Sequence, residues 1–131
     1  MRTDLVADTL TVIRNAYMIK KETVDVIKNN LILSILEILK RENYISNLKV
    51  LEGQTPKLIR VYLKYDSEGK SAIIGLERVS KSSLRRYVHA KRIPKVLNGL
   101  GLAILTTSKG VVTNKEAREM KIGGEIILSV W

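Results

Sequence analysis

The sequence predicts an α+β fold built from two small domains, and three observations lead to this prediction. In the first half of the chain, apolar residues recur twice at helical spacing, and an extended segment follows each helix. The second half contains short strand-like runs separated by glycine-containing turns, with only brief helical segments. The richest turn signal, residues 66–69, lies between the halves. We therefore expect one domain over residues 1–66 and another over residues 67–131.

Two amphipathic helices are expected in the first half. Over residues 4–17, apolar side chains recur on one helical face, and Thr3 is a candidate N-cap. The second helix, near residues 31–41, has a wide apolar stripe and could be capped by Asn29 or Asn30. Strands are expected at residues 24–27, 44–51 and 59–64, and the turn at 53–56 should join the last two as a hairpin.

The second half should alternate short strands with brief helices. Pro94 suits the first position of a helix, and Gly99 or Gly101 suits its end. We expect strands near residues 71–79, 84–88, 101–107 and 124–130, and helices around residues 94–99 and 113–121.

Composition argues against several classes of function. The chain has 131 residues, of which 45% are hydrophobic, and its formal net charge of +10 suggests a polyanionic partner. The absence of cysteine excludes disulfides, a thiol nucleophile and cysteine zinc sites, and a single histidine argues against a metal cluster. No apolar run has the length of a membrane span, and the first residues do not resemble a signal or transit peptide. We expect no metal, no cofactor and no membrane partner.

Basic residues are concentrated in the second half. Residues 1–66 hold 11 Lys or Arg and 8 acids, a net of +3, whereas residues 67–131 hold 12 and 5, a net of +7. The segment 78–115 has no acid and nine basic residues: Arg78, Lys81, Arg85, Arg86, Lys91, Arg92, Lys95, Lys109 and Lys115. A charged run is often only a solvated surface, but such surfaces usually mix signs. We therefore interpret this segment as a nucleic-acid-binding surface.

A hydroxyl-rich turn follows the apolar run at residues 102–105. It consists of Thr106, Thr107, Ser108, Lys109 and Gly110. Hydroxyls, a lysine and a glycine at the end of a strand are suited to binding a phosphate–sugar backbone or base edges. The same residue types are common in ordinary turns, and their spacing alone does not separate the two interpretations.

Catalytic signals are weak. A hydrolase triad would need His89, which lies in the basic segment, and no serine lies in a GxSxG motif. The glycines at 99–101 and 123–124 form neither a Walker nor a Rossmann fingerprint. We expect no enzyme and no small-molecule substrate, and a small enzyme that uses His89 with a nearby acid is kept as an alternative.

Four ordered segments carry a family resemblance. They are DLVADTLTVIRNA (4–16), ERVSKSSLRRY (77–87), RIPKVLNGLG (92–101) and GLAILTTSKGVVTNKEAR (101–118), the last followed by IGGE. Through these segments the whole chain resembles the small-subunit ribosomal protein eight family, of bacterial or plastid type. The resemblance implies a two-domain α+β protein with an N-terminal α-β-α-β-β unit and a smaller, strand-rich C-terminal unit with short helices.

The resemblance also implies a function. Members of this family are non-enzymatic constituents of the small ribosomal subunit that bind the central domain of its rRNA early in assembly, and bacterial members can bind their own operon messenger. The expected partners are this rRNA, neighbouring small-subunit ribosomal proteins and, as a further option, the operon mRNA. We expect RNA contacts from the turn residues Thr106, Thr107, Ser108, Lys109 and Gly110 with Glu125; from Arg78, Ser80, Lys81, Arg85, Arg86, Tyr87, Lys91 and Arg92; and from Asp4, Thr11, Arg14 and Asn15.

Physical roles can be assigned within the turn. We expect Thr107 and Ser108 to contact base edges or 2′-hydroxyls, Lys109 to neutralise a phosphate and Gly110 to allow close approach of the backbone. The carboxylate of Glu125 would repel phosphate. We therefore expect it either to accept a hydrogen bond from a base amino group or a 2′-hydroxyl, or to order the loop.

Two positions depart from the family pattern. Thr106 stands where the family usually has serine, which keeps the hydroxyl and adds a methyl group. Ser82 and Ser83 stand where the family usually has Pro-Gly, which removes a preset turn from the loop at residues 81–84.

One further alternative concerns the function and another the compartment. A free-standing basic RNA chaperone or messenger-binding regulator would show little preference between its cognate RNA and a random duplex. The terminal Trp131 and the richness in Ile, Lys and Asn resemble plastid-encoded members. We therefore expect a ribosome in the plastid stroma, with the bacterial cytoplasm as the alternative.

Overall fold

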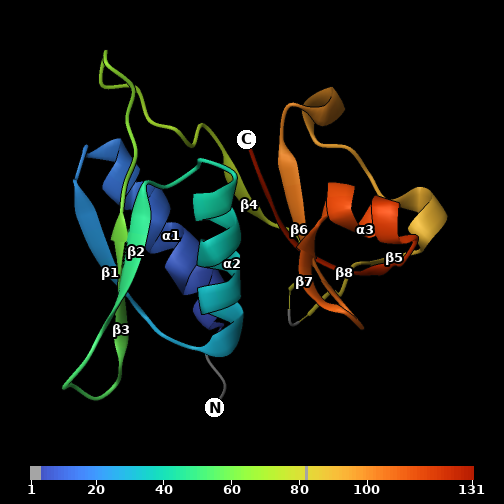
Figure 1. The fold of residues 1–131 in the computed structure, drawn as a ribbon, viewed down its shortest axis with the longest axis horizontal. Coiled ribbons are helices and arrows are strands. Elements are labelled where there is room, and N and C mark those ends of the chain that lie inside the picture. Colours follow the sequence, from blue (N-terminus) through green and yellow to red (C-terminus); the bar gives the residue numbers. More distant parts are fainter. Residues whose placement is uncertain (1–3, 82) are drawn as a thin grey trace. The chain divides into compact units, whose positions relative to one another are not determined.

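The computed structural model describes residues 4–81 and 83–131 and has the predicted α+β fold (Figure 1). Two compact units, which meet in sequence between Ile73 and Ile74, each contain an antiparallel sheet. The N-terminal unit contains α1 (Leu5–Met18), β1 (Thr23–Ile27), α2 (Asn30–Arg41), β2 (Asn47–Leu51) and β3 (Leu58–Tyr62). The C-terminal unit contains β4 (Leu76–Arg78), β5 (Tyr87–Val88), the 3-10 helices η1 (Ala90–Arg92) and η2 (Leu97–Gly99), β6 (Leu102–Thr107), β7 (Gly110–Thr113), α3 (Asn114–Met120) and β8 (Gly124–Val130).

Both helices of the N-terminal unit begin at a side-chain cap. The Asp4 carboxylate accepts a hydrogen bond from the Ala7 amide at 3.2 Å, and the Asn29 side chain accepts one from the Ile32 amide at 2.7 Å. Asp4 is therefore the N-cap of α1, a role predicted for Thr3, which lies outside the described residues. Asn29, one of two candidates, is the N-cap of α2.

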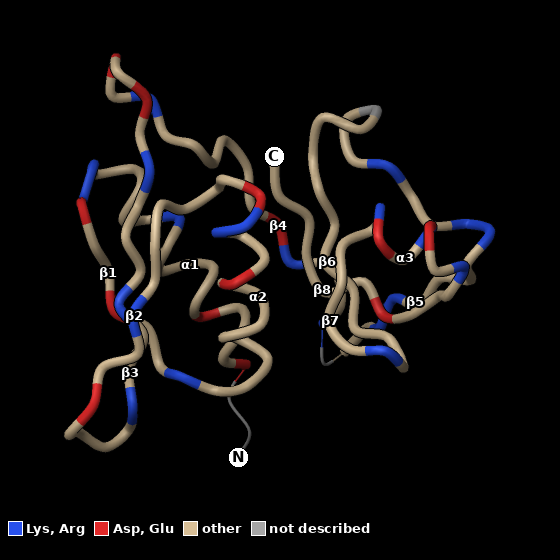
Figure 2. The backbone as a smooth tube through the Cα atoms, viewed as in Figure 1, with Lys and Arg blue, Asp and Glu red and all other residues tan. Residues whose placement is uncertain are grey.

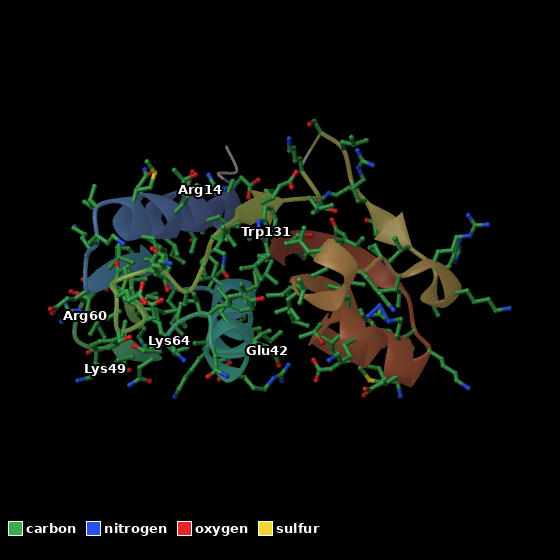
Figure 3. All side chains as sticks on the ribbon, turned by 90° about the horizontal axis from the view of Figure 1, so that it is seen from above. Arg14, Glu42, Lys49, Arg60, Lys64 and Trp131 are labelled. Carbon is green, nitrogen blue, oxygen red and sulfur yellow. The ribbon has the colours of Figure 1, made fainter. Side chains whose placement is uncertain are left out.

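The sheet of the N-terminal unit has the strand order β1-β3-β2, so the predicted hairpin of β2 and β3 is present. Helices α1 and α2 pack on one face of this sheet (Figure 1), where Val26 and Ile59 are buried. On the other face Asp25, Arg60 and Lys49 are cross-strand neighbours, and the last two are labelled in Figure 3. Arg60 donates two hydrogen bonds to the Asp25 carboxylate, at 2.9 and 3.1 Å. This face therefore mixes charges of both signs.

Tyr17 connects three segments of the N-terminal unit. Its side chain is buried, and its hydroxyl donates a hydrogen bond to the Tyr44 carbonyl at 2.7 Å and accepts one from the Lys64 amide at 3.1 Å. Burial raises the pKa of Tyr17 from its ordinary 10.0 to about 12. The fold therefore favours the neutral hydroxyl.

The N-terminal unit continues past the boundary predicted at residue 66. The chain turns back after that residue, and the Ala72 amide donates a hydrogen bond to the Lys64 carbonyl at 2.9 Å. The Lys20 ammonium also donates a hydrogen bond to the Gly69 carbonyl. Because the segment after the turn pairs with the first unit, the compact unit ends later than the turn signal indicated.

The C-terminal unit is built around β8. Strand β6 pairs along one edge of β8, while β4 and β5 pair with different parts of the other edge. Strand β7 pairs with β6, and α3 packs against both (Figure 1). The core between these elements contains Leu105, Val112, Ala117 and Ile126. The predicted final strand is therefore the central strand of the sheet.

Several elements predicted in the second half differ in extent. The strands expected near 71–79 and 84–88 reduce to β4 and β5, because the chain between them leaves the edge of β8 as a loop. Pro94 does not begin a helix, since η2 starts at Leu97. Strand β7 was not predicted, because only the pair Val111 and Val112 marks it in the sequence.

Two glycines, Gly123 directly before β8 and Gly124 as its first residue, permit very close strand contacts. A Cβ atom on Gly123 would overlap the carbonyl oxygen of Val88 in β5, and one on Gly124 would overlap the carbonyl oxygen of Thr106 in β6. Backbones can approach this closely only where no side chain intervenes. Both flanking strands therefore depend on glycine at the start of β8.

We predict that Gly124→Ala lowers the free energy of unfolding by about 1–3 kcal/mol, because the added methyl group must push β6 away from β8. Chemical denaturation measures this effect. Ser129→Ala, near the other end of the same strand, is the control. An unfolding midpoint equal to that of the wild-type protein would contradict the close contact.

A second prediction concerns Tyr17 and pH. Since its pKa is about 12 in the folded protein and 10.0 in the unfolded chain, the unfolded state loses the proton first as the pH rises. The stabilisation is therefore complete below pH 10 and is lost between about pH 10 and 12. Tyr17→Phe should reduce this alkaline loss and should cost about 1–3 kcal/mol at neutral pH, because two backbone groups lose their partner.

Denaturation curves recorded from pH 7 to 12 test this prediction, with Tyr62→Phe on the outer face of the sheet as the control. Part of the alkaline loss should remain, because burial also raises the pKa of Tyr44 and Tyr65. The same pH profile in Tyr17→Phe and the wild-type protein would show that Tyr17 has no part in the alkaline loss.

Candidate nucleic-acid interface

The hydroxyl-rich turn connects β6 and β7. Thr107 and Gly110 pair across the strand ends, and Ser108 and Lys109 form the turn between them. Gly110 has a φ of +104°, in the left-handed region that favours glycine. Ser108 and Lys109 are both exposed, so the turn presents a hydroxyl and an ammonium group to solvent.

Thr107 stabilises this turn internally. Its hydroxyl donates a hydrogen bond to the Gly110 carbonyl at 2.8 Å and accepts one from the Lys109 amide at 3.1 Å. Ser108 has no hydrogen bond from its hydroxyl to any described residue, and Thr106 is exposed. Thr107 therefore holds the backbone of the turn, whereas Thr106, Ser108 and Lys109 are exposed to solvent.

Glu125 lies at the centre of a row that crosses three strands. Its register partners are Thr106 in β6 and Tyr87 in β5, and directly opposed residues place their side chains on the same face. The Glu125 side chain is only 14% exposed and accepts a hydrogen bond from Nη1 of Arg85 at 2.9 Å. Tyr87 is 69% exposed. The sheet thus brings together a hydroxyl, a carboxylate, an exposed ring and an arginine.

The loop between β4 and β5 is closed at its base. Ser80 donates its amide hydrogen to the Ile126 carbonyl at 3.1 Å, and the Ile126 amide donates to the Arg86 carbonyl at 2.9 Å. Further out, Lys81 and Leu84 form an antiparallel bridge. Ser82, one of the two departures from the family pattern, lies outside the described residues.

Ser80 has a different role from the predicted one. It is 0% exposed, so its side chain does not reach the surface, and this burial gives no support to the RNA contact expected of it. Its hydroxyl accepts a hydrogen bond from the Arg86 amide at 2.8 Å. Ser80 therefore holds the two ends of the loop together.

The other predicted cations of this unit are mostly at the surface. Arg78 is partly buried at the end of β4, whereas the remaining ones are exposed: Lys81, Arg85, Arg86, Lys91 and Arg92. Figure 2 shows Lys and Arg recurring along the loops of the C-terminal unit. All of these residues belong to the acid-free segment and precede the β6–β7 hairpin in the chain.

A buried asparagine that was not predicted supports the segment after η1. Asn114 is 3% exposed, and its Oδ1 accepts a hydrogen bond from the Ala103 amide at 3.2 Å. Its Nδ2 donates to the Pro94 carbonyl at 3.0 Å. The side chain therefore ties β6 and α3 to the loop that follows η1, and its only signal in the sequence is a polar residue at the start of a helix.

The candidates on α1 form a separate surface. Thr11, Arg14 and Asn15 are exposed on this helix, on which Figure 3 labels Arg14, and Asp4 is its N-cap. These residues belong to the N-terminal unit, whereas all other candidates belong to the C-terminal unit. Each unit therefore presents its own candidate surface.

Other kinds of site are not assembled in residues 4–81 and 83–131. His89 is exposed and precedes η1 without a side-chain capping hydrogen bond. Within these residues no three His, Cys, Asp or Glu side chains are grouped so as to hold a metal ion. The described helices also include none with the length and apolar character needed to cross a membrane.

Bacterial proteins are among the known relatives of this chain. The chain is 51% identical over 129 residues to the small ribosomal subunit protein uS8 of Levilactobacillus brevis. It is 50% and 51% identical over 129 residues to the proteins of the same name from Streptococcus pneumoniae and Enterococcus faecalis. Each alignment covers 98% of both proteins. The bacterial type is therefore supported, and these relatives give no support to the plastid expectation.

A family model described as ribosomal protein S8 matches residues 4–131, which includes both units and every candidate residue. The match, together with these relatives, shows that the chain belongs to the ribosomal protein S8 family.

Proposed function

We propose that this chain is a non-enzymatic structural constituent of the small ribosomal subunit that binds its rRNA mainly through the C-terminal unit. Membership of the ribosomal protein S8 family supports the ribosomal role. The observation that supports a specific RNA contact is the row of Thr106, Glu125 and Tyr87 beside the exposed turn of Ser108 and Lys109.

The proposed roles follow from what each side chain presents. The hydroxyl of Ser108 can reach a base edge or a 2′-hydroxyl, and the exposed ring of Tyr87 can stack on an unpaired base. Lys109 neutralises a phosphate. Thr107, whose hydroxyl is engaged within the turn, acts by holding Ser108 and Lys109 in place.

The surrounding cations supply affinity without sequence discrimination. Lys81, Arg86, Lys91 and Arg92 are exposed, and each phosphate that they neutralise releases counterions. Specificity therefore comes from the turn and the row at Glu125, while the exposed cations supply the electrostatic part of the affinity.

The proposal extends to the partners. The RNA is the central domain of the small-subunit rRNA, in which the protein stabilises a helical junction during assembly, and the α1 surface is a second contact. Neighbouring small-subunit ribosomal proteins are further partners, and the operon messenger is a second RNA for the same surface. We assign the ribosome to the bacterial cytoplasm in preference to the plastid stroma, because the relatives above are bacterial.

Competition binding tests the proposal. The protein is titrated with a junction fragment from the rRNA central domain in the presence of a random-sequence duplex of equal length. A strong preference for the junction is expected. Equal affinity for both RNAs would favour a free-standing RNA chaperone instead, and cofractionation with small subunits would then be absent.

We predict that Lys109→Ala reduces the salt slope of junction binding by about one, because one phosphate contact is lost. The measurement is the slope of log K against log salt concentration. Lys57→Ala, which removes an exposed lysine next to β3 in the N-terminal unit, is the matched control and should leave the slope unchanged. The same slope in Lys109→Ala and wild-type protein would exclude Lys109 from the phosphate contacts.

We predict that Ser108→Ala weakens junction binding by about 1–3 kcal/mol, the cost of one specific contact, and leaves binding to the random duplex nearly unchanged. Both affinities are measured at one salt concentration. Because the Ser108 hydroxyl makes no hydrogen bond to a described residue, the fold should not change. Equal losses on both RNAs would rule out a role of this hydroxyl in specificity.

A further inference from the structure

An acidic side chain lies within the basic surface of the C-terminal unit. The segment 78–115 has no acid, yet the sheet places Glu125 of β8 between β5 and β6 of that segment. Its carboxylate oxygen Oε2 lies 2.9 Å from Nη1 of Arg85. The Glu125 side chain is 14% exposed and the Arg85 side chain 49%. The ion pair therefore has one sheltered member and one member at the surface.

We propose that Glu125 is the built-in counter-ion of Arg85, and that it positions this arginine and suppresses its attraction for RNA of any sequence. The proposal rests on the proposed function in taking RNA as the ligand. The Glu125 carboxylate sets the position and the effective charge of Arg85. It thereby contributes to the discrimination between RNAs.

The two partners differ in how firmly the fold holds them. Glu125 has register partners on both edges of β8, so its backbone is fixed from two sides. Arg85 lies in the loop between β4 and β5, just before the point where Arg86 returns to the edge of β8. Because the rigid member is the carboxylate, the ion pair fixes the guanidinium, and Glu125 acts as the positioning residue.

The effect is expected in binding more than in stability. An ion pair with one half-exposed member contributes little to folding, because solvent screens it. A neutralised guanidinium, however, attracts phosphate less than a free one, whatever the RNA sequence. Specificity is a difference between the affinities for two RNAs, so a lower affinity for random RNA increases the specificity. A guanidinium held in one orientation can still donate to a matching group on the cognate RNA.

The test uses a random-sequence RNA duplex and four full-length proteins: wild type, Glu125→Gln, Arg85→Gln and the double variant. Glutamine keeps the shape of glutamate and removes its charge. With Arg85 present, Glu125→Gln should steepen the salt slope by about one, because one cation becomes available for phosphate. In the Arg85→Gln background, Glu125→Gln should change the salt slope little. Glu119→Gln, an exposed acid on α3 of the same unit, is the control for a general change of charge.

Two outcomes of this test would overturn the proposal. Equal steepening by Glu125→Gln in both backgrounds would show that the carboxylate acts on the whole surface and not through Arg85. No steepening in either background would show that the ion pair does not control the charge of Arg85. Neither measurement requires cognate RNA, so both can be read even if the proposed rRNA preference fails.

Titration of the same four proteins with the rRNA junction tests the discrimination. The ratio of junction affinity to random-duplex affinity should fall about fivefold or more in Glu125→Gln, the lower range for one lost specific contact. This fall should disappear in the Arg85→Gln background. A fall of equal size without Arg85 would assign Glu125 to a direct RNA contact and overturn the positioning role.

Discussion

The C-terminal unit depends on the close approach of three strands at the start of β8. At Gly123 and Gly124 no side chain separates β8 from its neighbours, so β5 and β6 are both drawn against it. This contact fixes the register in which Thr106, Glu125 and Tyr87 lie in one row. Strand β6, whose close contact with β8 depends on Gly124, also forms one side of the β6–β7 hairpin. The absence of two side chains therefore determines where the presented side chains lie.

The sequence predicts the N-terminal unit well because its helices are defined locally. The periodic positions Leu10 and Ile13 in α1, and Asn29 as the cap of α2, can be read without knowledge of the fold. The C-terminal unit is less predictable because its edge strands are very short. Strand β5 has only the residues Tyr87 and Val88, and its existence depends on pairing with β8. A local pattern cannot indicate such pairing.

In the candidate site, too, some features follow from local sequence and others depend on the pairing of distant segments. The turn predicted within Thr106 to Gly110 is present at Ser108 and Lys109, since hydroxyls and glycine mark a strand end, although the flanking residues belong to β6 and β7. The separate role of Thr107 follows only from its hydrogen bonds within the turn. The ion pair of Arg85 with Glu125 joins residues far apart in the chain, and it depends on a register that no sequence spacing reveals.

The polar residues of the C-terminal unit have two physically distinct tasks. Ser80, Thr107 and Asn114 use their side chains to satisfy backbone groups at the bases of loops. Removing one of these side chains would leave the backbone group that it serves without its hydrogen-bond partner. Ser108 and Lys109 are free of this duty and lie in solvent. A surface that must recognise RNA by shape requires both kinds, because a presented group discriminates only when its backbone is held in one position. The hydroxyls and the amide that hold the backbone are thus as necessary to the proposed recognition as the groups that are presented to solvent.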